Sequence, residues 1–180
     1  MKISAYGVHL FTALGAALGL WALLLIFDGF YKEAIWVLGV AVLVDSIDGT
    51  LARYVDTKKN APQFDGSLMD NIIDYTTWTL APLCWIYATM SIPIWVLMIC
   101  AVSSIFGFTN TEAKTEDNFF TGFPSYWNIV VLYLYLLNLS ELFAIICLLI
   151  FAVSTFCPFR LLILQTQHFQ RPTSYNVGGS

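Results

Sequence analysis

The chain has 180 residues, of which 58% are hydrophobic and 11% are charged, and its formal net charge is -4. A soluble domain carries about 25% charged residues, so this balance argues against a soluble protein and for one that lies in a membrane. No basic stripe runs through the sequence, which argues against nucleic acid as a partner. The four cysteines lie in or near apolar segments and are typical of small buried residues rather than of disulfides or a zinc site.

Six segments come near the roughly 20 apolar residues that a helix needs to cross a bilayer. They are residues 8–27, 34–48 with an extension past Arg53, 68–90, 92–108, 124–138 and 142–156. Pro82 lies inside the third segment and predicts a kink there. The expected fold class is therefore an all-α integral membrane protein, with a six-helix transmembrane bundle over residues 1–157. Residues 158–180 are expected to form a short polar or interfacial tail.

The Lys and Arg residues of the connecting segments predict the orientation of this bundle. With six spans, both termini and the second and fourth links share one side, and that side holds all of the eight Lys and Arg residues except Lys32. Positive charge gathers on the cytoplasmic side of membrane proteins. We therefore expect both termini in the cytoplasm.

Four aspartates lie around the link between the second and third segments, in the runs D45-S-I-D48-G49-T-L-A52-R53 and G66-S-L-M-D70-N-I-I-D74. Spacings of three and four residues put each pair on one face of a helix. The end of one membrane helix and the start of the next lie at similar depth, so we expect all four carboxylates to meet. Because like charges repel, a divalent metal ion is the economical way to hold them together, since hard cations bind carboxylate oxygens.

Other residues in the same region are weighed against ordinary structural roles. A single acid near a helix end is often only a cap or a solvated charge, and this is our interpretation of Asp56 and Asp65. Ionisable residues within membrane helices, in contrast, are functional by default. Gly49 and Gly66 permit close approach of a ligand to the backbone, although small residues also serve helix packing. Arg53 is suited to contact a phosphate or to extend towards the membrane surface.

The complete pattern, D45-x2-D48-G49-x2-A52-R53 followed by G66-x3-D70-x3-D74, resembles the signature of the CDP-alcohol phosphotransferases. These are six-helix membrane enzymes that move a phosphoalcohol from a CDP-activated donor. Twelve residues separate Arg53 from Gly66, more than in most members, and this longer gap is similar to the phosphatidylcholine synthase branch of bacterial enzymes. The stretches H9-L-F-T-A-L-G15 and F120-T-G-F-P-S-Y-W-N128 resemble the same branch.

The resemblance implies a function and a set of site residues. Members of that branch condense CDP-diacylglycerol with choline, giving phosphatidylcholine and CMP, at the cytoplasmic face of the bacterial inner membrane. The four aspartates are implied to bind two divalent ions, Mn2+ or Mg2+, and Asp74 is implied to be the base that takes the proton of the choline hydroxyl. The residues implied to bind the nucleotide are Asp48, Gly49, Ala52, Arg53 and Gly66. Relatives in the wider family are often homodimers.

Choline is a quaternary ammonium ion, so its recognition is expected to use aromatic faces and carboxylates. The aromatic candidates are Tyr75, Trp78, Tyr126 and Trp127, with Glu112 or Asp117 as the opposite charge. Aromatic residues near helix ends also form ordinary interfacial belts. His9 is interpreted as a packing or interfacial residue rather than as a base.

Three alternatives remain beside this prediction. The acceptor alcohol could be inositol, serine or glycerol phosphate instead of choline. Members of the branch are longer, with two further helices after the sixth, so a truncated and catalytically silent form is a second alternative. A divalent-cation transporter is the third, but the acids gather at one face and do not line a path across the bilayer.

Overall fold

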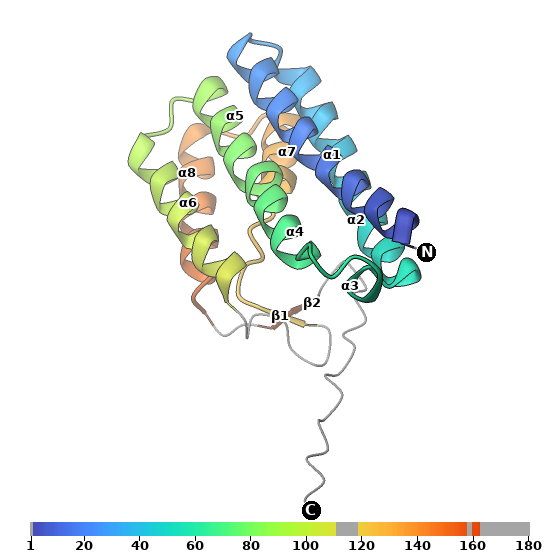
Figure 1. Ribbon diagram of the computed structural model, residues 1–180. Helices are drawn as coiled ribbons and strands as arrows, with labels where there is room; N and C mark the ends of the chain where they lie inside the picture. The colour runs from blue at the N-terminus through green and yellow to red at the C-terminus, as the bar shows by residue number, and fades with distance from the viewer. Residues whose placement is uncertain (1, 111–118, 158–159, 163–180) are drawn as a thin grey trace, which may run out of the picture.

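A computed structural model of the chain describes residues 2–110, 119–157 and 160–162, and shows a bundle of helices with a small sheet at one end (Figure 1). The helices are α1 (Lys2–Phe27), α2 (Tyr31–Val55), α3 (Thr57–Asn60), α4 (Gly66–Asp74), η1 (Tyr75–Leu80), α5 (Ala81–Thr89), α6 (Ile94–Thr109), α7 (Trp127–Leu137) and α8 (Glu141–Ser154). Helical structure thus occurs at all six of the predicted positions. The third predicted segment corresponds to α4, η1 and α5, which follow one another without a break over residues 66–89.

The small sheet is a feature that the all-α expectation did not include. Strands β1 (Phe119–Thr121) and β2 (Arg160–Leu162) pair in antiparallel register, with Phe119 opposite Leu162. Aromatic and β-branched residues such as those of β1 favour strands. The second strand falls within the predicted polar tail, and the remainder of that tail lies outside the described residues.

A π-helical segment, η1, lies just before Pro82, the position at which the sequence predicts a kink. In η1 the helix widens, and the backbone N–H of Ala81 donates to the carbonyl of Thr76, five residues earlier. Proline has no N–H to donate, so the regular helical ladder is interrupted at this position. The wide turn begins directly after Asp74, and such π segments are frequent at functional sites.

The long gap between Arg53 and Gly66 forms the link between α2 and α4, and it contains a short helix of its own. Asp56 ends α2 in the left-handed conformation, with φ of 50°, and the chain then forms the single turn α3. The side chain of Asn60 fastens this turn by donating to the carbonyl oxygens of Val55, at 2.8 Å, and Asp56, at 3.1 Å. Asp65 is the N-cap of α4, since its Oδ1 accepts from the N–H groups of Ser67 and Leu68. These are the structural roles that the sequence predicted for Asp56 and Asp65.

Two apolar clusters hold the bundle together. The larger one lies mainly among α5, α6, α7 and α8, takes in Ile26 of α1 and Ala34 of α2, and contains Phe123, whose ring stacks on Phe151. Gly122 precedes this stack with φ of +86°, and a Cβ there would collide with the backbone carbonyl of Thr155 after α8. The smaller cluster joins α1, α2 and α5 and consists of Ala22, Val37, Leu38 and Ala81.

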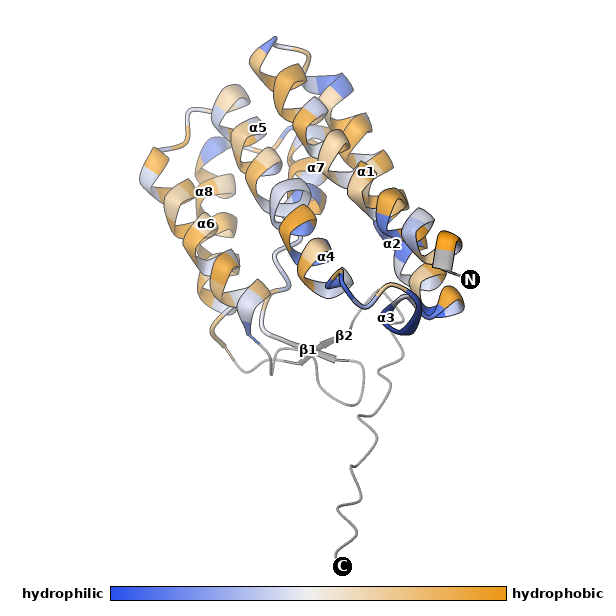
Figure 2. Cartoon of the chain, viewed as in Figure 1, coloured by the Kyte–Doolittle hydropathy of each residue, from blue (hydrophilic) through white to orange (hydrophobic). Residues whose placement is uncertain are grey.

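The outer surface of the helices is apolar. Large hydrophobic side chains such as Leu10, Trp36 and Leu142 are about 70% exposed, and Figure 2 shows hydrophobic colour along the lengths of the helices. Extended apolar surface of this kind marks contact with a membrane or a partner. Among the described residues, Ile3–Phe27 and Tyr31–Val55 are helices long and apolar enough to cross a bilayer, while α6, α7 and α8 are apolar but shorter.

The two ends of the bundle differ in character. The start of α1, α3, the start of α4 and the β1–β2 pair lie at one end (Figure 1), where hydrophilic colour is concentrated around α3 (Figure 2). The turns that join α1 to α2, α5 to α6 and α7 to α8 lie at the other end. There, Glu141 at the start of α8 accepts a 2.9 Å hydrogen bond from the N–H of Ser91.

Candidate active site

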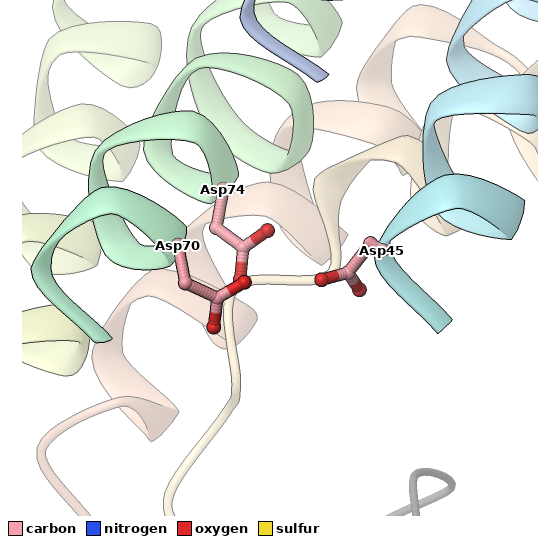
Figure 3. Close-up of side chains that lie close together, drawn as sticks. All are labelled: Asp45, Asp70 and Asp74. Carbon is pink, nitrogen blue, oxygen red and sulfur yellow. The ribbon is translucent and has the colours of Figure 1, made fainter. Parts of the chain in front are cut away.

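Three of the predicted aspartates converge from two helices. Asp45 projects from α2, and Asp70 and Asp74 project from α4 towards it (Figure 3). One carboxylate oxygen of each residue lies within 4.8 Å of the others, and all three side chains are half-buried. Residues four apart lie on one face of a helix, which is why Asp70 and Asp74 point the same way. The predicted meeting of acids from the second and third segments therefore exists in the structure.

Asp48 occupies a different place from the other three acids. It lines the same pocket but is buried, with 5% of its surface exposed, and it is not part of the group of three oxygens. Its carboxylate interacts with the hydroxyl of Thr12 on α1 and with the backbone N–H of Gly49. The Thr12 hydroxyl also lies 3.3 Å from the carbonyl oxygen of Val8. The structure thus groups three of the four predicted acids and puts the fourth in the pocket wall that faces α1.

The rest of the pocket wall comes from residues that the sequence analysis did not assign. They are Thr12 and Gly15 from α1, Ala41 and Val44 from α2, Ile73 from α4 and Thr77 from η1. Thr12 and Gly15 belong to the stretch H9-L-F-T-A-L-G15, and their spacing of three residues puts them on one helix face. That spacing was the available signal, but it does not say which helix the face meets.

The residues predicted to bind the nucleotide lie along the end of α2 and the start of α4. Gly49 and Ala52 are half-buried, whereas Arg53 is exposed and donates from its guanidinium to the hydroxyl of Thr50 at 3.0 Å. A Cβ at Gly66 would lie 3.1 Å from Cε1 of His9, so His9 occupies the space beside that glycine.

His9 itself is enclosed between α1 and the start of α4. Its imidazole is 7% exposed and its ring centroid lies 5.7 Å from that of Phe64. The side chain therefore has packing contacts of the kind that the sequence analysis expected.

Two of the predicted aromatic residues lie beside the acids. Trp78 in η1 packs on Tyr126, with ring centroids 5.0 Å apart and an angle of 44° between the rings. Tyr126 immediately precedes α7. Its hydroxyl is partly buried and lies close enough to Asp45 and Asp74 to feel their negative charges. Tyr126, with Trp78 packed on its ring, therefore lies near the negative charge of Asp45 and Asp74.

The other predicted aromatic residues have different surroundings. Tyr75 turns towards α6, where its hydroxyl donates to the carbonyl of Ala101 at 3.3 Å and its ring meets Phe108. Trp127 is fully buried, packs on Phe123 and donates its indole N–H to Ser104 at 2.7 Å. These contacts make Trp127 part of the core. Glu112 and Asp117 lie outside the described residues.

The group of three carboxylates fits a divalent cation. It offers only hard oxygen donors, which Mg2+, Mn2+ and Ca2+ prefer over softer ligands. Two oxygens bound to one Mg2+ lie at most about 4.2 Å apart, twice the usual bond length of 2.1 Å. A group that lies within 4.8 Å therefore needs only a small adjustment to close on one ion.

Comparison with known proteins assigns the chain to a class. The model of the CDP-alcohol phosphatidyltransferase family matches residues 8–157, and the chain belongs to this family. This confirms the family that the aspartate pattern indicated.

Individual relatives carry a more specific name. A phosphatidylcholine synthase of Pseudomonas aeruginosa is 40% identical over 158 residues, which cover 86% of this chain and 66% of that protein. A phosphatidylcholine synthase of Legionella pneumophila is 37% identical, over 86% of this chain and 63% of the relative. One of Borreliella burgdorferi is 35% identical, over 88% and 69% respectively. The chain thus spans about two thirds of the length of these relatives.

Proposed function

We propose that this protein is a membrane enzyme that condenses CDP-diacylglycerol with choline to give phosphatidylcholine and CMP. The observation that carries the proposal is the convergence of Asp45, Asp70 and Asp74 in a chain of the CDP-alcohol phosphatidyltransferase family. The choice of choline is supported by the similarity to proteins named phosphatidylcholine synthase.

The acids are proposed to hold the metal. Asp45, Asp70 and Asp74, with Asp48 in the adjoining wall, would bind Mn2+ or Mg2+, and two ions are expected by analogy with the family. When bound, a divalent ion supplies charge neutralisation for the pyrophosphate of the donor and for the CMP that leaves.

Asp74 is proposed as the general base. A free hydroxyl is a weak nucleophile, so a carboxylate within hydrogen-bond reach is needed to take its proton. The choline oxygen attacks the phosphorus that carries the diacylglycerol, its proton passes to the Asp74 carboxylate, and the bond from that phosphorus to the CMP oxygen breaks. Asp74 ends α4 inside the pocket, between the other acids and η1, which supports this role.

The binding of the two substrates divides between two sides of the acid group. Gly49, Ala52 and Arg53 at the end of α2, with Asp48 and Gly66, are proposed to contact the nucleotide. On the other side, Trp78 and Tyr126 are proposed to contact the trimethylammonium group of choline, because their rings lie beside negative charge. Tyr75 and Trp127 are left out of this set because their side chains are engaged with α6 and the core.

The membrane topology is proposed to be six spans over residues 1–157, in the bacterial inner membrane, with both termini and the acids on the cytoplasmic side. Arg53, Lys58 and Lys59 lie near the acid end of the bundle, and Lys32 lies at the start of α2, at the opposite end. A homodimer is expected from the wider family. Labelling of single introduced cysteines in intact cells tests the orientation, and light scattering of the purified protein tests the dimer.

The activity is tested with purified protein in detergent, supplied with CDP-diacylglycerol, Mn2+ and labelled choline. We expect CMP release that depends on choline and label that appears in lipid. If inositol, serine or glycerol phosphate drives CMP release and choline does not, the proposed acceptor is wrong. If no alcohol releases CMP although Mn2+ binds, this chain is not the proposed enzyme.

A further inference from the structure

One face of α1 packs directly against the helix that carries two of the acids. Thr12, Gly15 and Gly19 lie on this face and are all buried. A Cβ built on Gly15 would lie 2.6 Å from Cγ2 of Ile73. Ile73 lies between Asp70 and Asp74 in α4 and lines the same pocket. The glycine therefore allows α1 to touch the helix at the level of the acids.

Ile73 has little freedom to make room for a larger residue at position 15. Its Cγ2 is bonded directly to Cβ, and a β-branched side chain in a helix keeps one strongly preferred χ1 rotamer. The distance of 2.6 Å is well short of the 3.4 Å at which ordinary van der Waals contact begins. A methyl group at position 15 must therefore displace the backbone of α4 relative to α1.

Such a displacement would change the separation of the acids. Asp45 is on α2, which is joined to α1 by a short turn and packs along it, as Figure 1 shows. Asp70 and Asp74 are on α4, the helix that would move. The carboxylate oxygens of the three acids lie within 4.8 Å of one another, while two oxygens bound to one Mg2+ lie at most about 4.2 Å apart. Any further separation of the acids should therefore weaken metal binding.

We propose that Gly15 is a positioning residue whose missing side chain sets the distance between Asp45 on α2 and the Asp70–Asp74 pair on α4. The proposal deepens the proposed function and rests on it only for the role of the acids as metal ligands. Gly15 makes no contact with substrate in this proposal. It acts through Ile73.

The test is Mn2+ binding by the purified full chain, measured as loss of the free-ion signal in electron paramagnetic resonance. For Gly15→Ala we expect the Mn2+ Kd to rise about 10-fold or more, as for other changes that misplace metal ligands. The matched control is Gly7→Ala, also in α1, where a Cβ would meet nothing within 4 Å. We expect this control to bind Mn2+ like the unchanged protein and to melt at the same or a slightly higher temperature, since alanine favours a helix more than glycine does.

A double variant distinguishes an effect on the position of the acids from general damage to α1. Gly15→Ala is also measured in a chain that carries Ile73→Ala, where the colliding methyl group is gone. There we expect the rise in Kd to fall below about 3-fold, because the two sites are coupled by direct contact. An equal rise in both backgrounds would overturn the proposal, as would unchanged binding by Gly15→Ala or a wild-type chain that binds no Mn2+.

A milder variant covers the case in which Gly15→Ala does not fold. A Cβ at Gly19 would lie 3.0 Å from Cγ2 of Thr76 and 3.1 Å from Cγ2 of Thr77, both in η1, which continues α4. Gly19→Ala should therefore displace this continuous helix less strongly than Gly15→Ala. We expect a rise in Mn2+ Kd of about 3-fold, and equality with Gly7→Ala would overturn the proposal. Mn2+ binding needs no choline, so a failure of CMP release leaves this result interpretable, and the reverse also holds.

Discussion

The two halves of the bundle are built from different kinds of contact. Around the acids, α1, α2 and α4 meet through glycines and hydroxyls, and a small apolar cluster of alanine, valine and leucine joins α1 and α2 to α5. In the half formed by α5 to α8, aromatic rings fill the interior, and Phe123 stacks on Phe151 with centroids 4.8 Å apart. Large side chains contribute most to burial, so stability is concentrated in the half that lacks the acids.

This difference indicates that one half of the bundle serves the chemistry and the other half provides most of the stability. Like charges held close together oppose folding unless something positive joins them, and the acid half has little apolar burial to offset that repulsion. The aromatic half provides a rigid frame on which the acid half can be assembled. Changes in the first half should therefore alter chemistry with little loss of stability, and changes in the second should do the opposite.

Removal of divalent metal is the largest expected perturbation of the acid half. With excess chelator we expect CMP release to stop, because no charge would then compensate the donor pyrophosphate and the clustered carboxylates. Addition of Mn2+ or Mg2+ should restore it, and addition of K+ should not. The assay is CMP release before and after chelation, and full turnover in chelator would contradict the proposed site.

Asp74→Asn should strongly lower the rate of CMP release and leave the fold intact. Loss of a general base lowers the rate by about 10²- to 10⁴-fold. The amide keeps the shape of the side chain and removes one of the clustered charges, so we expect partial Mn2+ binding and no fall in the melting temperature of the metal-free protein. The control is Asp28→Asn, at an exposed position in the turn after α1. Turnover near the normal rate would exclude Asp74 as the base.

Trp127→Ala should lower the stability of the fold and leave the chemistry of the acid half in place, since it empties part of the aromatic core. Truncation of a buried tryptophan costs about 3–5 kcal/mol of unfolding free energy. Unfolding can be followed by the reaction of a thiol-specific dye with Cys100, which is buried in the folded protein. Trp36→Ala is the control, because Trp36 is 71% exposed. If both variants melt at the same temperature, the aromatic half does not carry the stability that we assign to it.

Trp78→Leu is the smallest predicted change and tests the boundary between the halves. Loss of a cation–π contact of about 0.5–2 kcal/mol should raise KM for choline roughly 2- to 30-fold and leave KM for CDP-diacylglycerol unchanged. Tyr75→Phe, which keeps the ring beside Phe108, should leave both constants unchanged. An equal rise in both constants for Trp78→Leu would show a general packing defect instead.

Much of this arrangement was predictable because its signals are local in sequence. Apolar runs located all six helical segments, and the spacing of Asp70 and Asp74 showed that they share a face. Asp48 was harder to place. At 100° per residue, positions 45 and 48 point about 60° apart on the helix surface, and the neighbour on each side decides what each one meets. For Asp48 that neighbour is Thr12 of α1.

Other features depend on contacts between distant segments, which spacing alone does not reveal. The approach of Gly15 to Ile73, and of Gly66 to His9, requires knowledge of how α1 lies against α4. The sequence predicted a kink at Pro82 but not the π segment before it, and the pairing of β1 with β2 joins segments about 40 residues apart. Sequence alone could not choose between the core and the pocket for Trp127, since both favour an aromatic residue.

The tight fit of Gly122 against the end of α8 has a consequence for how this protein can diversify. The N–H of Phe123 donates to the carbonyl of Ser154 at 3.2 Å, so the backbone segment that leads to Tyr126 is held against α8, which contributes no side chain to the group of three carboxylates. We therefore expect substitutions in α8 to shift Tyr126, on which Trp78 packs, without moving the helices that carry the acids. Under the proposed function, a change of acceptor alcohol would then need no change in the residues proposed to act on the nucleotide donor.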